Sequence, residues 1–403
     1  MKNEKIAVAL AFIGLMFFSV GFALGINSFL IPTLQSSLSL PSSVAYLLLA
    51  ASFVPFLIWG MPASKLIEKV GYKKTMAIAF VIFAAAFSLF VVSASMRSFP
   101  LFLIASFVSG SANAILQAAI NPYITILGDI KSAAMRMSIM GICNKLAWPV
   151  APLFFGLLVK NPAYVTISDL FLPFYIIIGI FLLLGVISLM APLPDVVASG
   201  EESADDSSAK TEESSYAANK TSIWQFPHLL LGALTLFIYV GVETLSLSTA
   251  VDYATYLRLP NPGSYAFIPS IGMIVGYICG VLFIPRLISQ ESAMRICAVI
   301  GVVGSLGLVF APAQISIWMI FPMSLGCSLL WPALWPLAMA DLGRFTKAGS
   351  GLLTMAIAGG AVVPLIFGFL KDYLPMQSAY WLAVPCFALI FFYGFMGYKI
   401  RTK

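Results

Sequence analysis

The chain has 403 residues, of which 61% are hydrophobic and only 9% are charged, whereas a soluble globular protein carries about a quarter charged residues. This composition excludes a soluble domain and indicates a polytopic membrane protein. The formal net charge of +6 is explained by loop residues and their attraction to lipid headgroups, so we expect no nucleic-acid partner.

Apolar runs long enough to cross a membrane follow one another along the whole chain. A helix needs about 20 such residues to span a hydrocarbon core about 30 Å thick. The expected spans are residues 6–31, 43–64, 76–95, 100–127, 137–159, 170–191, 228–251, 264–285, 294–312, 315–340, 350–370 and 379–398. The sequence therefore predicts twelve transmembrane helices.

The basic residues are unequally divided between the two sides of this predicted bundle. If the N-terminus is cytoplasmic, 17 of the 22 Lys and Arg residues fall on the inner side. Only Arg97, Lys160, Arg258 and Lys371 then fall on the outer side. Because positive residues accumulate on the cytoplasmic side of membrane proteins, we expect both termini in the cytoplasm.

Charged residues mark three predicted cytoplasmic ends. The loop from Glu68 to Lys74 has Gly71 at its centre, and glycine permits a tight turn there. Asp129 and Asp341 end the fourth and tenth spans at equivalent positions. We interpret Glu68, Asp129 and Asp341 as gating residues or partners of helix ends, whose contacts break when the bundle changes conformation.

Amide side chains form a stripe in the predicted fourth span. Asn113, Gln117 and Asn121 recur every four residues, which places them on one helix face. An amide offers both a donor and an acceptor, so three of them suit a ligand with several hydroxyl groups. Hydrogen bonding between helices is the alternative role for each residue.

The tenth span carries a second patterned face. Ser324, Ser328, Trp331 and Trp335 follow at spacings of four, three and four, which predicts that they lie together. An indole ring can stack on the apolar face of a ring-shaped ligand while its N–H donates to a hydroxyl. Trp148 in the fifth span is a further aromatic candidate.

Two charges are expected near the middle of the membrane. At 1.5 Å per residue, Lys145 in the fifth span and Glu243 in the seventh lie at that depth, and Asp252 lies nearer the outer end. An isolated charge there is costly, so Lys145 and Glu243 are expected to face water, substrate or each other. Either Glu243 binds a coupling cation beside Lys145, or the two form a static ion pair.

The predicted spans fall into two groups of six. Residues 194–222 are rich in Ser, Ala and acidic residues, as is typical of a flexible linker. VAPLFFG at 150–156 recurs as VVPLIFG at 362–368. The sequence predicts an all-α fold with two pseudo-symmetric bundles, an N-terminal one over 1–193 and a C-terminal one over 223–403, joined by a cytoplasmic linker.

Segments in both groups resemble the fucose, glucose/galactose and N-acetylglucosamine permease family of the major facilitator superfamily. They are GINSFLIPTLQ from Gly25, LQAAINPYITILGD from Leu116, SIMGICNK from Ser138, LFIYVGVET from Leu236 and WPLAMADLGRFTKAGSGLLTMAIAGGAVVPLIFG from Trp335. The loop from Glu68 is similar to the superfamily's charged loop, with Ser64 and Glu68 in place of the usual Gly and Asp.

The resemblance implies the major facilitator fold and cation-coupled uptake of a hexose or hexosamine across a bacterial inner membrane by alternating access. A proton is favoured over sodium as the cation. The fucose branch uses acidic residues for proton movement at two positions that hold Ser28 and Gln117 here, and neither side chain titrates near neutral pH. Any coupling in this chain is therefore expected to use other residues.

The residues and the resemblance together give a set of candidates. The candidates for substrate binding are Asn27, Asn113, Gln117, Asn121, Asn144, Trp148, Glu243, Ser328, Trp331 and Trp335. The candidates for coupling or gating are Lys145, Glu243, Asp129, Asp341 and Glu68.

Other functions remain as alternatives. A drug exporter of the same fold would be expected to have a less polar cavity, and a membrane sugar sensor would bind without transport. An enzyme is not expected, because the sequence has a single His, no useful Cys spacing and no phosphate-binding loop. We expect no cofactor and no metal site, and a monomer in the lipid bilayer.

Overall fold

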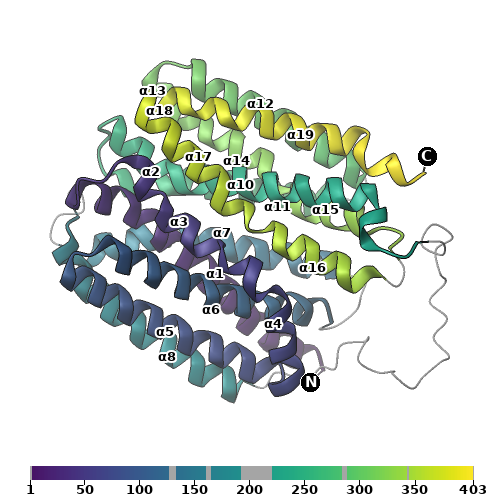
Figure 1. Ribbon diagram of the computed structural model, residues 1–403, viewed down its shortest axis with the longest axis horizontal. Coiled ribbons are helices and arrows are strands. Elements are labelled where there is room, and N and C mark those ends of the chain that lie inside the picture. The colour runs from purple at the N-terminus through teal and green to yellow at the C-terminus, as the bar shows by residue number, and fades with distance from the viewer. Residues whose placement is uncertain are drawn as a thin grey trace.

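The computed structural model describes residues 2–126, 133–159, 165–191, 220–283, 288–342 and 345–402. Every regular element in these ranges is a helix (Figure 1). The elements before residue 191, called here the N-terminal set, are α1 (Lys2–Ser37), α2 (Ser42–Ala45), α3 (Leu47–Phe53), α4 (Pro55–Val70), α5 (Tyr72–Met96), α6 (Phe99–Ile126), α7 (Ala133–Leu158), η2 (Ile167–Leu170) and α8 (Phe171–Met190).

The elements after residue 220 are called the C-terminal set. They are η3 (Ile223–Gln225), α10 (Pro227–Tyr256), η4 (Pro262–Ala266), α11 (Phe267–Phe283), α12 (Gln290–Phe310), α13 (Ala313–Ser316), η5 (Ile317–Met319), α14 (Ile320–Ser328), α15 (Leu330–Met339), α16 (Thr346–Ala356), α17 (Gly359–Tyr373), α18 (Met376–Ala379), η7 (Tyr380–Leu382), α19 (Ala383–Phe395) and η8 (Gly397–Thr402). The predicted linker falls almost wholly outside the described residues.

Within the described ranges, twelve helices or runs of helices are long and apolar enough to cross a membrane, which confirms the predicted number. The first, Val8–Ser37, continues beyond its predicted end at residue 31, because α1 runs through Pro32 without a break. Proline is tolerated in such helices when neighbouring groups satisfy the freed backbone.

The tenth span is less regular than predicted. Leu329, with φ −93° and ψ 4°, separates α14 from α15. Ser328 and Trp331 therefore do not lie on one continuous helix, and the predicted common face is broken between them. The spacing rule assumed an unbroken helix, although Pro332 was a signal for the interruption, because proline cannot donate the helical hydrogen bond to the carbonyl oxygen of Ser328.

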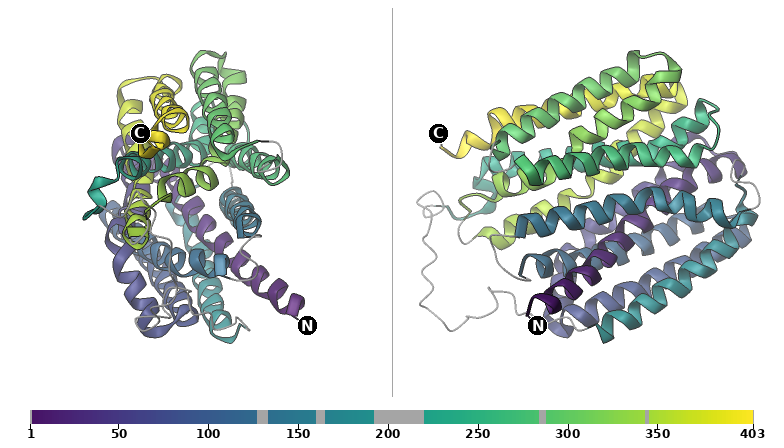
Figure 2. Two further views of the ribbon diagram at one scale, coloured as in Figure 1. Left: turned by 90° about the vertical axis from the view of Figure 1, so that its right-hand side faces the viewer. Right: turned by 180° about the vertical axis from the view of Figure 1, so that it is seen from behind.

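The helices lie side by side along the long axis of the molecule (Figure 1). α5 and α8 form one edge and α12 and α19 the other, while α1, α7 and α10 lie between them. Both chain ends lie at the same end of the bundle, which we call the terminal end (Figure 2). The opposite end, where α2 and α3 contact α17, is called the distal end.

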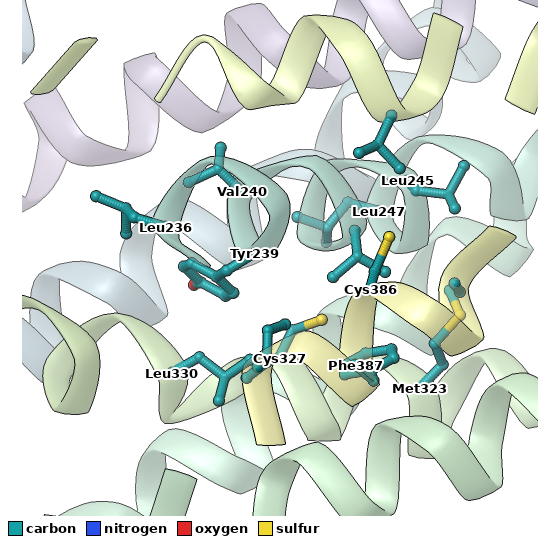
Figure 3. Close-up of a cluster of buried hydrophobic side chains, with 14 of the residues drawn as sticks. Leu236, Tyr239, Val240, Leu245, Leu247, Met323, Cys327, Leu330, Cys386 and Phe387 are labelled. Atoms are coloured by element: carbon teal, nitrogen blue, oxygen red, sulfur yellow. The ribbon is translucent and has the colours of Figure 1, made fainter. Parts of the chain in front are cut away.

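Two hydrophobic cores hold these helices together. The first contains only residues of the N-terminal set and includes stacked rings such as Phe83 and Phe181, whose centroids are 4.8 Å apart. The second is built around α10 and receives side chains from α14, α15 and α19 (Figure 3). It also includes Tyr46, Phe53 and Trp148, so it crosses from the C-terminal set into the N-terminal set.

The outer surface is apolar where lipid would contact it. Leu157, Met190 and Val303 are among many large hydrophobic side chains that are mostly exposed. In a soluble protein a continuous apolar surface of this kind would be a liability. It is the expected exterior of a membrane-spanning bundle.

Glycine allows one turn and one close helix contact that matter for the site. Gly71 joins α4 to α5 with φ +81°, which confirms the predicted tight turn. On α1, a Cβ at Gly21 would collide with the carbonyl oxygen of Asn144, and one at Gly25 would lie 2.8 Å from that of Trp148. These contacts fix the central part of α7 against α1.

We predict that Gly21→Ala lowers the unfolding temperature of the purified protein. The added methyl group forces α1 away from the backbone of α7, and such overpacking costs about 1–3 kcal/mol. Thermal unfolding in detergent measures the change. Gly179→Ala is the control, because no atom lies within 4 Å of a Cβ at that position. Equal unfolding temperatures for the two variants would contradict the assigned contact.

Candidate transport site

A cavity of ≈ 130 Å³ lies between the two helix sets. Its volume is roughly ten times what one water molecule needs. α1, α3, α6 and α7 line it on one side, and α10, α11 and α15 line it on the other. Its polar lining residues are Gln117, Asn121, Ser138, Asn144, Lys145, Glu243 and Thr244, and its larger aromatic ones are Trp148, Tyr239, Tyr277 and Trp331.

An ion pair crosses this cavity from one helix set to the other. The Nζ atom of Lys145, on α7, lies 3.2 Å from Oε1 of Glu243, on α10. The hydroxyl of Tyr239 donates to the same carboxylate oxygen at 2.7 Å. The side chains of Lys145 and Glu243 are only 10% and 11% exposed. Each charge therefore depends on the other helix set for neutralisation, as breaking a buried pair is strongly destabilising.

The amide stripe of α6 divides into two layers. Gln117 and Asn121 line the cavity, whereas Asn113 is buried behind them. Nε2 of Gln117 donates to Oδ1 of Asn113 at 2.8 Å, and Nδ2 of Asn113 lies 3.5 Å from the carbonyl oxygen of Val20. Asn113 therefore positions Gln117 and does not itself reach the cavity.

Asn144 and two tryptophans also reach the cavity. Nδ2 of Asn144 donates to the carbonyl oxygen of Phe17 on α1 at 3.1 Å, which orients the amide. Trp148 lines the cavity one turn further along α7, and Trp331 faces it from α15. The ring of Trp335 packs against that of Trp331 in a tilted arrangement, with a centroid distance of 5.2 Å, and lies outside the cavity lining.

Two other predicted substrate contacts also lie outside the cavity lining. Asn27 is buried, donates to the carbonyl oxygen of Ala23 at 3.2 Å and accepts from Ser106 at 3.1 Å. Ser328 donates to the carbonyl oxygen of Leu325 at 2.7 Å and packs against Gly276 of α11. The amide of Asn27 links α1 to α6, which is the alternative role considered for membrane amides, whereas the hydroxyl of Ser328 bonds within its own helix.

The predicted gating residues are only partly described. The side chain of Glu68 and the whole of Asp129 lie outside the described residues. Asp341 is exposed just beyond α15 and has a positive φ of 59°. No group of His, Cys, Asp and Glu side chains within the described ranges could hold a metal ion.

A second ion pair lies within the C-terminal set at the distal end, where side chains of the N-terminal set contact it. Nζ of Lys371, on α17, lies 2.8 Å from Oδ2 of Asp252 on α10. The hydroxyl of Tyr46, on the linkage between α2 and α3, donates to that oxygen at 2.8 Å, and Lys371 lies 3.5 Å from Oε1 of Gln35. Side chains of the N-terminal set thus bind both members of this distal pair.

Asp372 closes the same end through the backbone of α2. Its carboxylate accepts from the N–H of Ser42 at 2.6 Å and from the N–H of Ser43 at 2.9 Å. The N–H groups in the first turn of a helix have no acceptor within that helix, and here the carboxylate supplies one. Direct bonds between α2 and α17 therefore hold the two helix sets together at the distal end.

Sequence reasoning missed this distal network. Lys371 was assigned to an outer loop, because the apolar run of the eleventh span ended at residue 370, whereas α17 continues to Tyr373. A usable signal was present, since Asp252 and Lys371 have opposite charges at the outer ends of two spans.

The comparisons with known proteins agree with this architecture. Residues 13–363 match the model of the Major Facilitator Superfamily. The chain belongs to the Major Facilitator Superfamily. This major facilitator is 32% identical to a glucose/galactose transporter of Brucella abortus biovar 1 (strain 9-941), over 99% of this chain and 96% of the relative.

A second relative narrows the family within the superfamily to which the chain belongs. An L-fucose-proton symporter of Escherichia coli (strain K12) is 25% identical over 98% of this chain and 94% of its own length. The chain is thus a member of the transporter family that includes these glucose/galactose transporters and L-fucose-proton symporters, and it is not an enzyme.

Solved structures show the same fold. The transporter FucP in its outward conformation superposes with a TM-score of 0.71 at 23% identity, covering 99% of this chain and 100% of FucP. An inward-facing bacterial homologue of the human lysosomal transporter Spinster gives a TM-score of 0.69 at 13% identity, covering 100% and 97%. The predicted twelve-helix major facilitator fold is confirmed.

We predict that Lys371→Met speeds amide hydrogen exchange in α2 and in the last turn of α17. Without the lysine, Asp252 is left as a buried unpaired charge, which favours separation of the distal ends. Hydrogen–deuterium exchange with mass spectrometry measures the change, and the Ser42 and Ser43 amides are the most informative. Lys74→Met, at an exposed site on α5, is the matched control. Unchanged exchange in α2 of the Lys371 variant would show that the pair does not hold this end closed.

Proposed function

We propose that this protein imports a hexose or hexosamine of the glucose, galactose, N-acetylglucosamine or fucose class by alternating access, coupled to a cation. The observation that carries the proposal is the cavity between the two sets of helices, which amide side chains line in part and an ion pair crosses. The names of the relatives at 25–32% identity support the substrate class. A proton is favoured over sodium as the coupling ion.

The cavity lining suits a sugar. Gln117, Asn121 and Asn144 can each donate to and accept from hydroxyl groups in fixed directions. Trp331, held from behind by Trp335, presents a broad aromatic surface to the apolar face of a sugar ring. A drug exporter of the same superfamily would be expected to lack such a group of amides, so Gln117, Asn121 and Asn144 favour the sugar over that alternative.

The orientation of the protein in the membrane is inferred from the charge distribution. The excess of Lys and Arg at the terminal end supports cytoplasmic termini in a bacterial inner membrane. The distal end then faces the outside, and its network is the outer closure of the cavity. In this proposal residues 1–193 and 223–403 move as two bodies, joined by the linker 194–222, and import begins when the bonds of Asp252, Lys371 and Asp372 across the distal end break.

Coupling is assigned to Glu243. When Glu243 takes up a proton from the outside, its attraction to Lys145 is lost, and the two helix sets are released from each other at the level of the cavity. When the proton leaves to the cytoplasm, the pair reforms. Ser28 and Gln117 stand at the positions where the fucose branch has acidic residues, so they offer no competing carboxylate. A static ion pair is the rival account.

We predict that an inward proton gradient drives accumulation of labelled sugar in liposomes that contain the wild-type protein. Glu243→Gln is expected to abolish the response to the gradient while retaining exchange of labelled for unlabelled sugar, because an amide neither titrates nor holds the lysine by charge. Lys145→Met should likewise lose the gradient response. Glu291→Gln, which removes a carboxylate at the start of α12, is the control and should behave as wild type.

The alternatives give different results in the same assay. A wild-type protein that exchanges sugar but responds to neither proton nor sodium gradients has a static pair and no coupling at Glu243. A response to sodium alone identifies the other cation. A protein that binds sugar but shows no exchange is a sensor, and this outcome would refute the transport proposal.

A further inference from the structure

The two walls of the central cavity offer different hydrogen-bonding groups. The N-terminal set presents the three amides already described, whereas the C-terminal set presents mainly aromatic and apolar side chains. The hydroxyl groups on this second wall belong to Tyr239, Thr244 and Tyr277. The hydroxyl of Tyr239 donates to Glu243, and Thr244 is only 2% exposed. The hydroxyl of Tyr277, on α11, is therefore the one that a ligand can best reach from this side.

Close packing on two sides fixes the position of the Tyr277 ring. On one side α11 touches α14, because a Cβ at Gly276 would collide with the hydroxyl of Ser328. On the other side the ring reaches the N-terminal set, where its hydroxyl-bearing Cζ atom would be 3.1 Å from a Cβ at Gly141 of α7. Gly141 lies about one helical turn before Lys145 and also lines the cavity. The phenol therefore lies where the two helix sets meet at the cavity.

The hydroxyl of Tyr277 is free and accessible in the cavity wall. Within the described ranges it makes no hydrogen bond, and it is not among the unbonded polar atoms that packing encloses completely. The indole N–H of Trp148 is enclosed in that way and cannot meet a ligand in this conformation. The Tyr277 side chain as a whole is only 6% exposed. Because polar groups in such enclosed places normally have partners, this hydroxyl is available to one supplied by a ligand.

We propose that the hydroxyl of Tyr277 forms a hydrogen bond with one hydroxyl group of the transported sugar. A phenol can both donate and accept, so it matches a sugar hydroxyl. The inference rests on the proposed function and deepens it, because it names the neutral polar group by which the C-terminal set holds the substrate. A sugar bound to Tyr277 and to the amides of the opposite wall bridges the two helix sets.

The bond makes one position of the sugar ring a determinant of specificity. A sugar without a hydroxyl at that position leaves the phenol in an enclosed wall with no partner. A site built to bond a hydroxyl discriminates strongly against the analogue that lacks it. The aromatic rings of the same wall cannot distinguish the two sugars in this way, because they contact the apolar face of the ring.

Two rival roles for the hydroxyl lead to different results. In the first, it acts on Glu243, whose charge extends to Tyr277, and so influences proton uptake instead of sugar recognition. Its removal then changes the number of protons bound with each sugar. In the second, it bonds only water in the cavity, and its removal leaves sugar binding unchanged. Neither role makes one ring position special.

We predict that Tyr277→Phe abolishes discrimination at one position of the sugar ring. Calorimetry would measure binding of the parent sugar and of its monodeoxy analogues to wild type and variant. The variant is expected to bind the parent about tenfold more weakly, because one hydrogen bond is lost. The analogue without the hydroxyl read by Tyr277 is expected to bind wild type and variant equally. The number of protons bound with each sugar, measured in buffers of different ionisation enthalpy, should not change.

The matched control is Tyr175→Phe on α8, since Tyr175 is 60% exposed and lies outside the cavity lining. It should leave every affinity unchanged. Three results with Tyr277→Phe would overturn the inference: unchanged affinities, equal weakening of the parent and all the deoxy analogues, or a changed number of bound protons. Failure of every hexose and hexosamine to bind the wild type would instead refute the proposed function.

A measurement that keeps the hydroxyl remains decisive if Tyr277→Phe does not fold. Replacing Tyr277 with ortho-fluorotyrosine adds one small atom beside the hydroxyl, and fluorine NMR reports on its surroundings. The parent sugar is expected to shift this signal, and the deoxy analogue that lacks the bonded hydroxyl is expected to shift it less. The same label at Tyr175 should not respond. A signal at Tyr277 that saturating sugar leaves unmoved, or that all the deoxy analogues shift as the parent does, contradicts the inference.

Discussion

The structure depends on the need to neutralise charges that are buried inside a membrane bundle. Lys145 pairs with Glu243 at the cavity, and Lys371 pairs with Asp252 at the distal end. In both pairs the lysine and the acid lie on different spans, and the cavity pair has one partner in each helix set. Isolated charges in such places are expensive. Each pair therefore favours an arrangement in which its spans stay close, and any change of conformation must supply a replacement partner, whether water, a proton or a substrate.

The packing around the pairs separates rigid contacts from those that can open. The N-terminal set has a core of its own, and α1 is locked to α7 through the glycines that face Asn144 and Trp148. The C-terminal core instead extends across the interface through Tyr46, Phe53 and Trp148. These crossing contacts are hydrophobic and non-directional, so they can be exchanged for contacts with another surface at modest cost. Rigid bundles with an exchangeable interface are what alternating access requires.

The sequence predicted the parts of this account that depend on one helix at a time. The number of spans followed from hydropathy, and the positions of Lys145 and Glu243 in the middle parts of their spans followed from counting residues along each span. Roles that depend on how helices face one another did not follow. The amides of α6 do share one helix face, as predicted. Only the way in which α6 packs against α1 shows that Asn113 supports Gln117. Ser328 was assigned to the site because the spacing rule assumed one continuous helix and did not weigh Pro332, which cannot donate a helical hydrogen bond to Ser328. Lys371 was placed in a loop because a hydropathy window ends at charged residues.

The central claim is that Glu243 exchanges its bond to Lys145 for a proton during the sugar cycle. If the binding of sugar and the binding of a proton affect each other's free energy, thermodynamic linkage requires that sugar binding change the number of protons bound to the protein. Calorimetric titration of the purified protein with sugar, in two buffers of the same pH but different ionisation enthalpy, measures that number directly. The account predicts different heats in the two buffers for wild type and equal heats for Glu243→Gln. Sugar binding to wild type with the same heat in both buffers would contradict it.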